Sequence, residues 1–189
     1  MLRFLTILLS FLLIAGCQTF QKTEAVRTDI GEIYSIEPQI AWRRADREGI
    51  EIWTIDGPML QQIRFLKSIG DGDPILLSNR KVAEKKPRFS SKMSANEIME
   101  IVVASLDNGK RGQIKATNLR PMKFGSVQGF RFDLTWVSAK GLPYSAIVAA
   151  GVIAGSLELI FYTGDSLHHF AKFEDTVEKI LKSIQIKKA

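Results

Sequence analysis

The most regular hydrophobic pattern lies in the last third of the chain. Between residues 130 and 136 large apolar side chains alternate with polar ones, which predicts a strand with one buried face. Segments 144–153 and 157–162 are apolar on both faces, so we predict central strands that are covered from both sides. Apolar residues then recur at helical spacing over 166–184. This part therefore reads as a three-strand meander followed by an amphipathic helix.

The pattern in the first half is less regular. Segments 40–42 and 50–55 are rich in β-branched and aromatic residues and are predicted as strands, as is 113–119. Segment 59–69 fits either a helix or a strand. We favour a strand, because Gly-Pro precedes it and a Gly- and Asp-rich turn follows it.

A second helix is predicted over 94–106. Ser94 and Glu97 have the spacing of a capping box, in which each side chain satisfies a backbone amide at the helix start. Apolar residues then repeat along one face as far as Leu106, and Asn108-Gly109 follows as a stop signal.

The N-terminal pattern is typical of a targeting signal. One basic residue, Arg3, precedes an uncharged apolar run that ends at Ala15, and Gly16 and Cys17 follow. This resembles the lipobox of bacterial lipoproteins, although Ile14 replaces the commoner Leu. The resemblance implies cleavage before Cys17, a diacylglycerol thioether on its sulfur and an acyl group on its new amino terminus. Open alternatives are an ordinary cleaved signal peptide and an uncleaved anchor.

These features give three expected regions. Residues 1–16 are the signal peptide, 17–30 are the lipidated cysteine with a flexible polar tether, and 31–189 are one globular domain. Because Cys17 is the only cysteine, no disulfide can form within the chain. Gln18 stands where, in similar lipoproteins, Asp retains the protein at the inner membrane. It therefore favours the outer membrane, if the host has one.

The positive charge is concentrated in one segment. The chain has a net charge of +6, and residues 79–93 are predicted as a mobile loop. Within this basic segment the cationic residues are Arg80, Lys81, Lys85, Lys86, Arg88 and Lys92. They could contact an anionic lipid surface or an acidic partner, with Phe89 as an apolar anchor, or they could simply be solvated. A secretory signal makes nucleic acid an improbable partner.

Other candidate sites are weak. His168 and His169 are adjacent and would point about 100° apart on a helix, which suits one metal ion poorly. Asp71 and Asp73 flank a glycine but lack the remaining ligands of a calcium loop, so a turn is expected. The sequence contains no nucleophile elbow, phosphate loop or dinucleotide motif. We therefore expect no cofactor and no enzymatic activity, while carboxylate-only chemistry stays open.

The C-terminal pattern resembles a known fold. Gly129-Phe130-Arg131-Phe132, the run 157–162 and the helix ending in Lys182-Ser183-Ile184 are similar to the PsbP/DcrB-type α/β/α sandwich. The resemblance implies an α+β fold with an antiparallel sheet flanked by helices, and an envelope accessory role by analogy. Our expectation is a lipid-anchored, non-enzymatic envelope module. The alternatives are a carrier for a small molecule or lipid, and an unrecognised hydrolase.

Overall fold

The computed structural model describes residues 20–47, 50–75, 86–107 and 113–187, and its strands form two antiparallel sheets. In sheet order, the main sheet contains β1 (Gln21–Lys22), β4 (Arg43–Arg47), β5 (Ile50–Thr54), β6 (Gln61–Ile69), β10 (Ser156–Asp165), β9 (Pro143–Ile153), β8 (Val127–Val137) and β7 (Lys115–Phe124). The small sheet contains β11 (Gln185–Ile186), β3 (Tyr34–Ile36) and β2 (Thr28–Ile30). The small sheet thus joins two segments from opposite ends of the chain.

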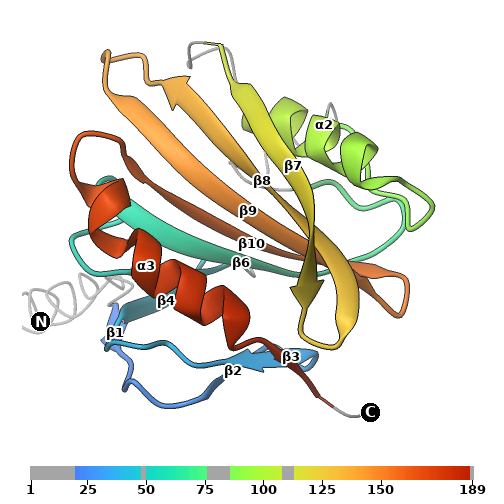
Figure 1. The fold of residues 1–189 in the computed structure, drawn as a ribbon, viewed down its shortest axis with the longest axis horizontal. Coiled ribbons are helices and arrows are strands. Elements are labelled where there is room, and N and C mark those ends of the chain that lie inside the picture. Colours follow the sequence, from blue (N-terminus) through green and yellow to red (C-terminus); the bar gives the residue numbers. More distant parts are fainter. Residues whose placement is uncertain (1–19, 48–49, 76–85, 108–112, 188–189) are drawn as a thin grey trace, which may run out of the picture.

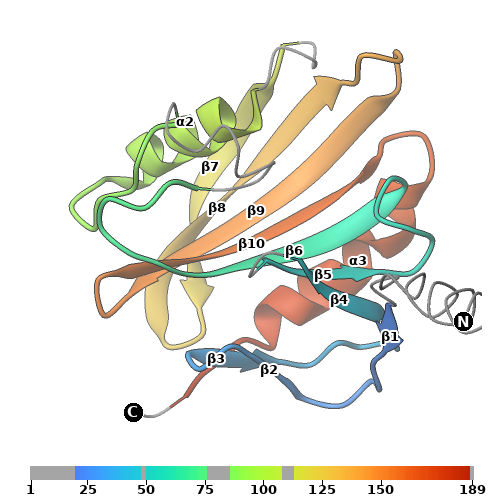
Figure 2. The same ribbon diagram turned by 180° about the vertical axis from the view of Figure 1, so that it is seen from behind.

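Two helices cover the opposite faces of the main sheet (Figures 1 and 2). Helix α2 (Ala95–Leu106) lies on one face and α3 (His169–Lys182) on the other. This arrangement confirms the predicted fold class, an antiparallel sheet flanked by helices. None of the described helices is long and apolar enough to cross a bilayer.

The α3 face has an aromatic core that the small sheet helps to close. Trp42 packs against Phe173 of α3 with ring centroids 5.8 Å apart, and Trp53 packs edge-on against Phe65 at 5.0 Å. Tyr34 of the small sheet meets Phe124 edge-on at 5.3 Å. The predicted helix face is confirmed, because Phe173, Val177, Ile180 and Leu181 are buried and Phe170 is partly buried.

The α2 face has a separate core. Apolar residues of α2 pack onto the alternating side chains that identified β8, including the fully buried Phe132 and Leu134. The capping box is present as predicted: Ser94 Oγ accepts from the Glu97 amide, and the Glu97 carboxylate accepts from the Ser94 amide at 2.7 Å. The two cores together confirm that β9 and β10 are covered from both sides.

Several predicted boundaries need correction. The expected strand 40–42 is wrong, because β4 begins only at Arg43 and Trp42 precedes it as a buried side chain. The segment expected as a tether is structured from Gln21, where β1 pairs with β4, and β2 pairs with β3. The ambiguous segment 59–69 is a strand, β6, as favoured.

Candidate functional site

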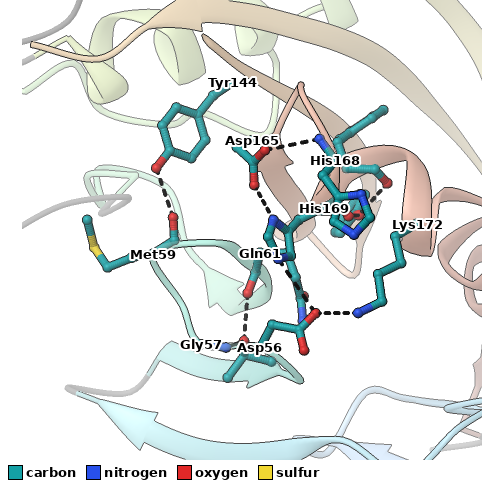
Figure 3. Close-up of polar contacts among 12 residues, drawn as sticks. Asp56, Gly57, Met59, Gln61, Tyr144, Asp165, His168, His169 and Lys172 are labelled. Carbon is teal, nitrogen blue, oxygen red and sulfur yellow. Dashed lines mark hydrogen bonds and ion pairs between the residues drawn. The ribbon is translucent and has the colours of Figure 1, made fainter. Parts of the chain in front are cut away.

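Three connections meet at one end of the main sheet, which we call the turn end: residues 55–60, 138–142 and 166–168 (Figure 3). Hydrogen bonds join them to one another. Tyr144 Oη donates to the carbonyl of Met59 at 2.8 Å, and the Asp165 amide donates to the carbonyl of Leu60 at 3.0 Å. The Ser166 amide donates to the carbonyl of Pro143 at 2.9 Å. The turn end is therefore a fixed surface made from distant parts of the sequence.

A recess of about 190 Å³ opens on the α2 side of the turn end, and we call it the end recess. It is lined by Pro58, Met59, Gln62, Arg64, Leu106, Trp136, Ser138, Tyr144, Phe161 and Thr163. Trp136 and Tyr144 are register partners on β8 and β9, and their rings stack with centroids 5.5 Å apart and planes 7° apart. The hairpin between these strands thus presents a preformed aromatic wall.

Polar groups line the other side of the end recess. Gln62 Nε2 donates to the carbonyl of Pro58 at 2.8 Å, and Arg64 Nε donates to Gln62 Oε1 at 3.0 Å. Burial, and secondarily the negative charge of Asp165, raises the pKa of Tyr144, so its hydroxyl stays protonated as a donor at neutral pH. Aromatic rings with a few held polar groups are typical of a binding site.

A second cluster fixes the start of α3. Asp165 Oδ2 lies 2.5 Å from His169 Nδ1, and Asp56 Oδ2 lies 3.8 Å from His169 Nε2 and 2.8 Å from Lys172 Nζ (Figure 3). Burial alone would raise the pKa of Asp165, but hydrogen bonds from His169 and the His168 amide hold it below its ordinary value. Gly164 allows the approach, because a Cβ there would lie 2.8 Å from the Phe170 amide nitrogen.

The contacts of this cluster hold the start of α3 against the turn before β6. Both ring nitrogens of His169 face carboxylates, and the ion pair between Lys172 and Asp56 ties α3 to the turn before β6. The side chain of His168 is exposed and its ring stands edge-on to that of His169. Among the described residues, no group of three potential ligands could hold a metal ion.

The basic segment is only partly described, because Arg80, Lys81 and Lys85 lie outside the described residues. Lys86 Nζ donates to the carbonyls of Ala104 at 2.9 Å and Asp107 at 2.5 Å. It therefore provides hydrogen bonds to carbonyl groups that have no amide partner at the end of α2. The expectation of a mobile loop is therefore wrong for Lys86.

The rest of the described basic segment packs on the turn after β6. Arg88 donates to the carbonyl of Gly72 at 2.7 Å, and Ser91 donates to Asp71. Phe89 is buried, so it cannot serve as an apolar anchor. Arg88 and Lys92 remain exposed. Asp73 accepts from the Gly70 amide within this turn, as the turn interpretation requires, and Asp71 accepts from Ser91 of the basic segment.

Two buried carboxylates lie on the α3 side of the sheet. Glu51 accepts from Trp53 Nε1 at 2.8 Å and pairs with Arg44 at 2.8 Å and Lys67 at 3.4 Å. Glu158 accepts from the Ser68 amide at 2.9 Å, but its Oε2 has no partner in the described structure. Burial raises the pKa of Glu158 to about 7, against the lowering effect of the Ser68 hydrogen bonds.

Comparison with known proteins identifies the fold of the chain but no family. No family model matches the chain, and no curated protein matches it. The solution structure of cyanobacterial PsbP (CyanoP) from Synechocystis sp. aligns with a TM-score of 0.52 at 9% identity, over 92% of this chain and 96% of that one. This likeness shows a PsbP-like α+β fold, as the sequence resemblance implied.

Two further structures align less well. A protein from Bacteroides thetaiotaomicron has a TM-score of 0.49 at 11% identity, over 90% of this chain and 49% of that one. LpqN of Mycobacterium tuberculosis, which is involved in cell envelope biogenesis, has a TM-score of 0.38 at 6% identity, over 93% and 88% of the two chains.

Sequence reasoning missed the end recess. The predicted lipidation site, Cys17, lies outside the described residues and stays a prediction. One signal was present: Trp136 and Tyr144 are each four residues from Lys140, the centre of the turn at 138–142, so a hairpin centred there would pair them. Arg64 and Phe161 also line the recess, but they lie on strands that are far apart in the sequence. No local sequence pattern therefore indicated that they would meet.

Proposed function

We propose that the protein is a lipid-anchored, non-enzymatic binding module of the bacterial cell envelope, and that the end recess is its recognition site. The recess carries the proposal, because it combines the preformed Trp136–Tyr144 wall with hydrogen-bonded Gln62 and Arg64. The lipobox at Cys17 supports the anchor and the envelope location. Several acyl chains on one cysteine would hold the domain firmly, since one chain binds a bilayer only marginally.

The size of the recess favours a polypeptide partner over a carried lipid. Small-molecule sites usually enclose about 300–1,000 Å³. The end recess offers about 190 Å³, which suits one apolar or aromatic side chain of an envelope protein. The exposed charges of Arg88 and Lys92 provide a second surface, which we propose meets an anionic surface in the envelope.

Mass spectrometry of the mature protein from its own membranes tests the anchor. We expect a chain that begins at Cys17 with lipid on the sulfur and on the amino group. The Cys17→Ala variant should not become stably membrane-bound in mature form. Recovery of an unmodified Cys17, or of a chain that retains residues 1–16, would refute the anchor.

A photo-crosslinking amino acid at Ser138, which lines the end recess, tests recognition. We expect a crosslinked envelope protein that disappears when Gln62→Phe fills the recess, while circular dichroism shows that the variant is folded. The same amino acid at Glu100, which is exposed on α2, serves as the matched control. Recognition elsewhere is indicated if the product forms equally from Glu100, or survives in the filled variant.

A further inference from the structure

The turn end is also the end at which the described chain enters the domain. In both views β1 lies at the same end of the long axis as the β5–β6 turn and the start of α3 (Figures 1 and 2). The strand ladder gives the same placement, because Lys22 pairs with Arg43 and Arg43 pairs with Thr54, the last residue of β5. The turn at 55–60 follows directly.

Exposed apolar side chains gather at this end. Six large hydrophobic residues are exposed in the described part of the chain, and four of them belong to the turns of the turn end or flank them. These four, which we call the apolar rim, are Met59, Leu60, Val137 and Leu167. Met59 and Leu167 are 77% and 74% exposed. Exposed apolar side chains that gather at one end of a molecule mark a contact with a protein or a membrane.

The distance to Cys17 decides between these partners. Only Gln18, Thr19 and Phe20 separate Cys17 from β1, which begins at Gln21. A fully extended chain covers at most about 3.6 Å per residue, so Gln21 can lie no more than about 14 Å from a lipid-bearing Cys17. The expected long tether is therefore absent from 21 onward, and an anchored domain would sit directly on its bilayer.

We infer that the apolar rim rests on the bilayer that holds the Cys17 anchor. The inference rests on the proposed lipidation, and adds an orientation that lipidation alone would not give. Met59 and Leu167 would enter the interfacial region, while the exposed Lys140, in the neighbouring turn, would meet anionic headgroups. The end recess, which shares Met59 with the rim, then opens beside the membrane surface.

The same orientation turns the exposed Arg88 and Lys92 of the basic segment away from that bilayer. Arg88 donates to Gly72 in the turn that follows Ile69, at the other end of β6, and Ser91, the neighbour of Lys92, donates to Asp71 in the same turn. The eight steps from the first to the last residue of β6 extend about 26 Å at 3.3 Å per step. An anionic surface that meets Arg88 and Lys92 would therefore belong to a partner on the side opposite the anchor.

Depth-sensitive fluorescence on the full lipidated protein tests this orientation. Lipidation blocks the only native cysteine, so an introduced cysteine can carry the fluorophore nitrobenzoxadiazole. We use Met59→Cys, Leu167→Cys and, as the far-end control, Lys92→Cys, each reconstituted in phosphatidylethanolamine–phosphatidylglycerol vesicles. At Met59 and Leu167 we expect a blue shift and quenching by nitroxide-labelled lipid. At Lys92 we expect neither.

A charge variant tests whether the rim itself makes the contact. With the fluorophore at Val137→Cys, the double change Met59→Glu and Leu167→Glu should abolish the quenching. Leu119→Glu, an exposed apolar position on the edge strand β7, should leave it unchanged. Quenching at Lys92, or equal quenching at both ends, would overturn the orientation. Shielding of the rim reporters without vesicles would instead assign the rim to a second copy.

A second attachment separates this inference from the lipidation proposal. The Cys17→Ser chain, with hexahistidine in place of residues 1–16, is held on vesicles that contain nickel-chelating lipid. The rim reporters should again be quenched and the Lys92 reporter should not. If native Cys17 proves unmodified while this pattern holds, only the anchor proposal fails. If the pattern is absent here as well, the orientation fails.

Discussion

The two faces of the main sheet are covered in different ways. On the α3 face, the helix and the small sheet both pack on the main sheet. An aromatic cluster around Trp42, Trp53 and Phe173 lies in this core. On the α2 face, a single helix covers the strands, and the end recess remains beside Leu106, its last residue. The α3 face also keeps an opening, because a recess of about 310 Å³ lies between α3 and the β7–β8 edge. Stability should nevertheless depend most on the α3 face, because the aromatic cluster lies there.

The α3 face also contains buried polar groups that lack hydrogen-bond partners. Glu158 and Tyr34 are fully buried, and Glu158 Oε2 and Tyr34 Oη have no hydrogen-bond partner in the described structure. Opposite Glu158, Ser68 has a positive φ of 53° at a register shift between β6 and β10. A closed core tolerates such groups only because its packing offsets their cost.

The largest expected effect is on α3. Phe173→Ala removes a buried ring that packs on Trp42 and should lower the free energy of unfolding by about 3–5 kcal/mol. Denaturant unfolding of the variant measures this loss. The neighbouring Glu174→Ala, at an exposed position, should change stability by no more than about 0.5 kcal/mol. Similar values for the two variants would mean that α3 does not seal this face.

The second prediction concerns the pH dependence from Glu158. Its pKa is about 7 in the folded state and 4.5 as a free group, so the folded state holds an extra proton between these values. The stability that this group contributes is complete below about pH 4.5 and is lost as pH rises through about 7. The loss is about 3 kcal/mol at 1.36 kcal/mol per pKa unit.

Glu158→Gln should remove this dependence. Relative to the variant, the wild-type protein should lose about 3 kcal/mol of unfolding free energy between pH 4 and pH 8. Glu174→Gln controls for the loss of a carboxylate at an exposed site. A difference that stays constant over this range would show that Glu158 ionises normally in the folded protein.

The third prediction moves to the α2 face. Lys86→Ala removes two charge-assisted hydrogen bonds to carbonyls at the end of α2 and should cost about 1.5 kcal/mol. Thermal or chemical unfolding measures the loss. Lys92→Ala is the matched control, because Lys92 is exposed and lies in the same segment. An equal effect of both substitutions would point to net charge rather than to the helix end.

The other end of α2 should respond slightly less. Ser94→Ala breaks the capping box and leaves the Glu97 amide without its side-chain acceptor, which should cost about 1 kcal/mol. Ser94→Asp should restore most of the loss, since Asp is also a good N-cap residue. A Ser94→Ala protein as stable as wild type would show that the capping box adds nothing to the stability of this exposed helix start.

The sequence predicted what local patterns control. Ser94 and Glu97 are three residues apart, and the alternation in β8 needs no distant partner, so both were predicted correctly. The small sheet was not predicted, because its pairing of Ile186 with Tyr34 joins the two ends of the chain and its strands have two or three residues. Strand β1 is equally short, and its polar residues suit a tether just as well.

The sites divide in the same way. The lipobox predicted at Cys17 is a linear motif that stays a prediction, whereas the role of Lys86 depends on a helix that begins nine residues later. Glu158 was visible as a lone charge in an apolar run, but its burial against Ser68 depends on the register of β6 and β10. The end recess needs four strands and α2 in place before its lining residues meet.

The last prediction tests the basic surface beside α2. In the unlipidated domain, with no anchor to orient it, Arg88 and Lys92 are free to approach anionic vesicles. Each basic residue near such a surface contributes about 1 kcal/mol, and the attraction fades within a Debye length. The pair Arg88→Gln and Lys92→Gln should therefore weaken co-sedimentation with anionic vesicles at low salt and leave the little binding at high salt unchanged. Lys86 is kept, because its loss would also disturb α2. Equal sedimentation of the two proteins at every salt concentration would show that these charges are only solvated.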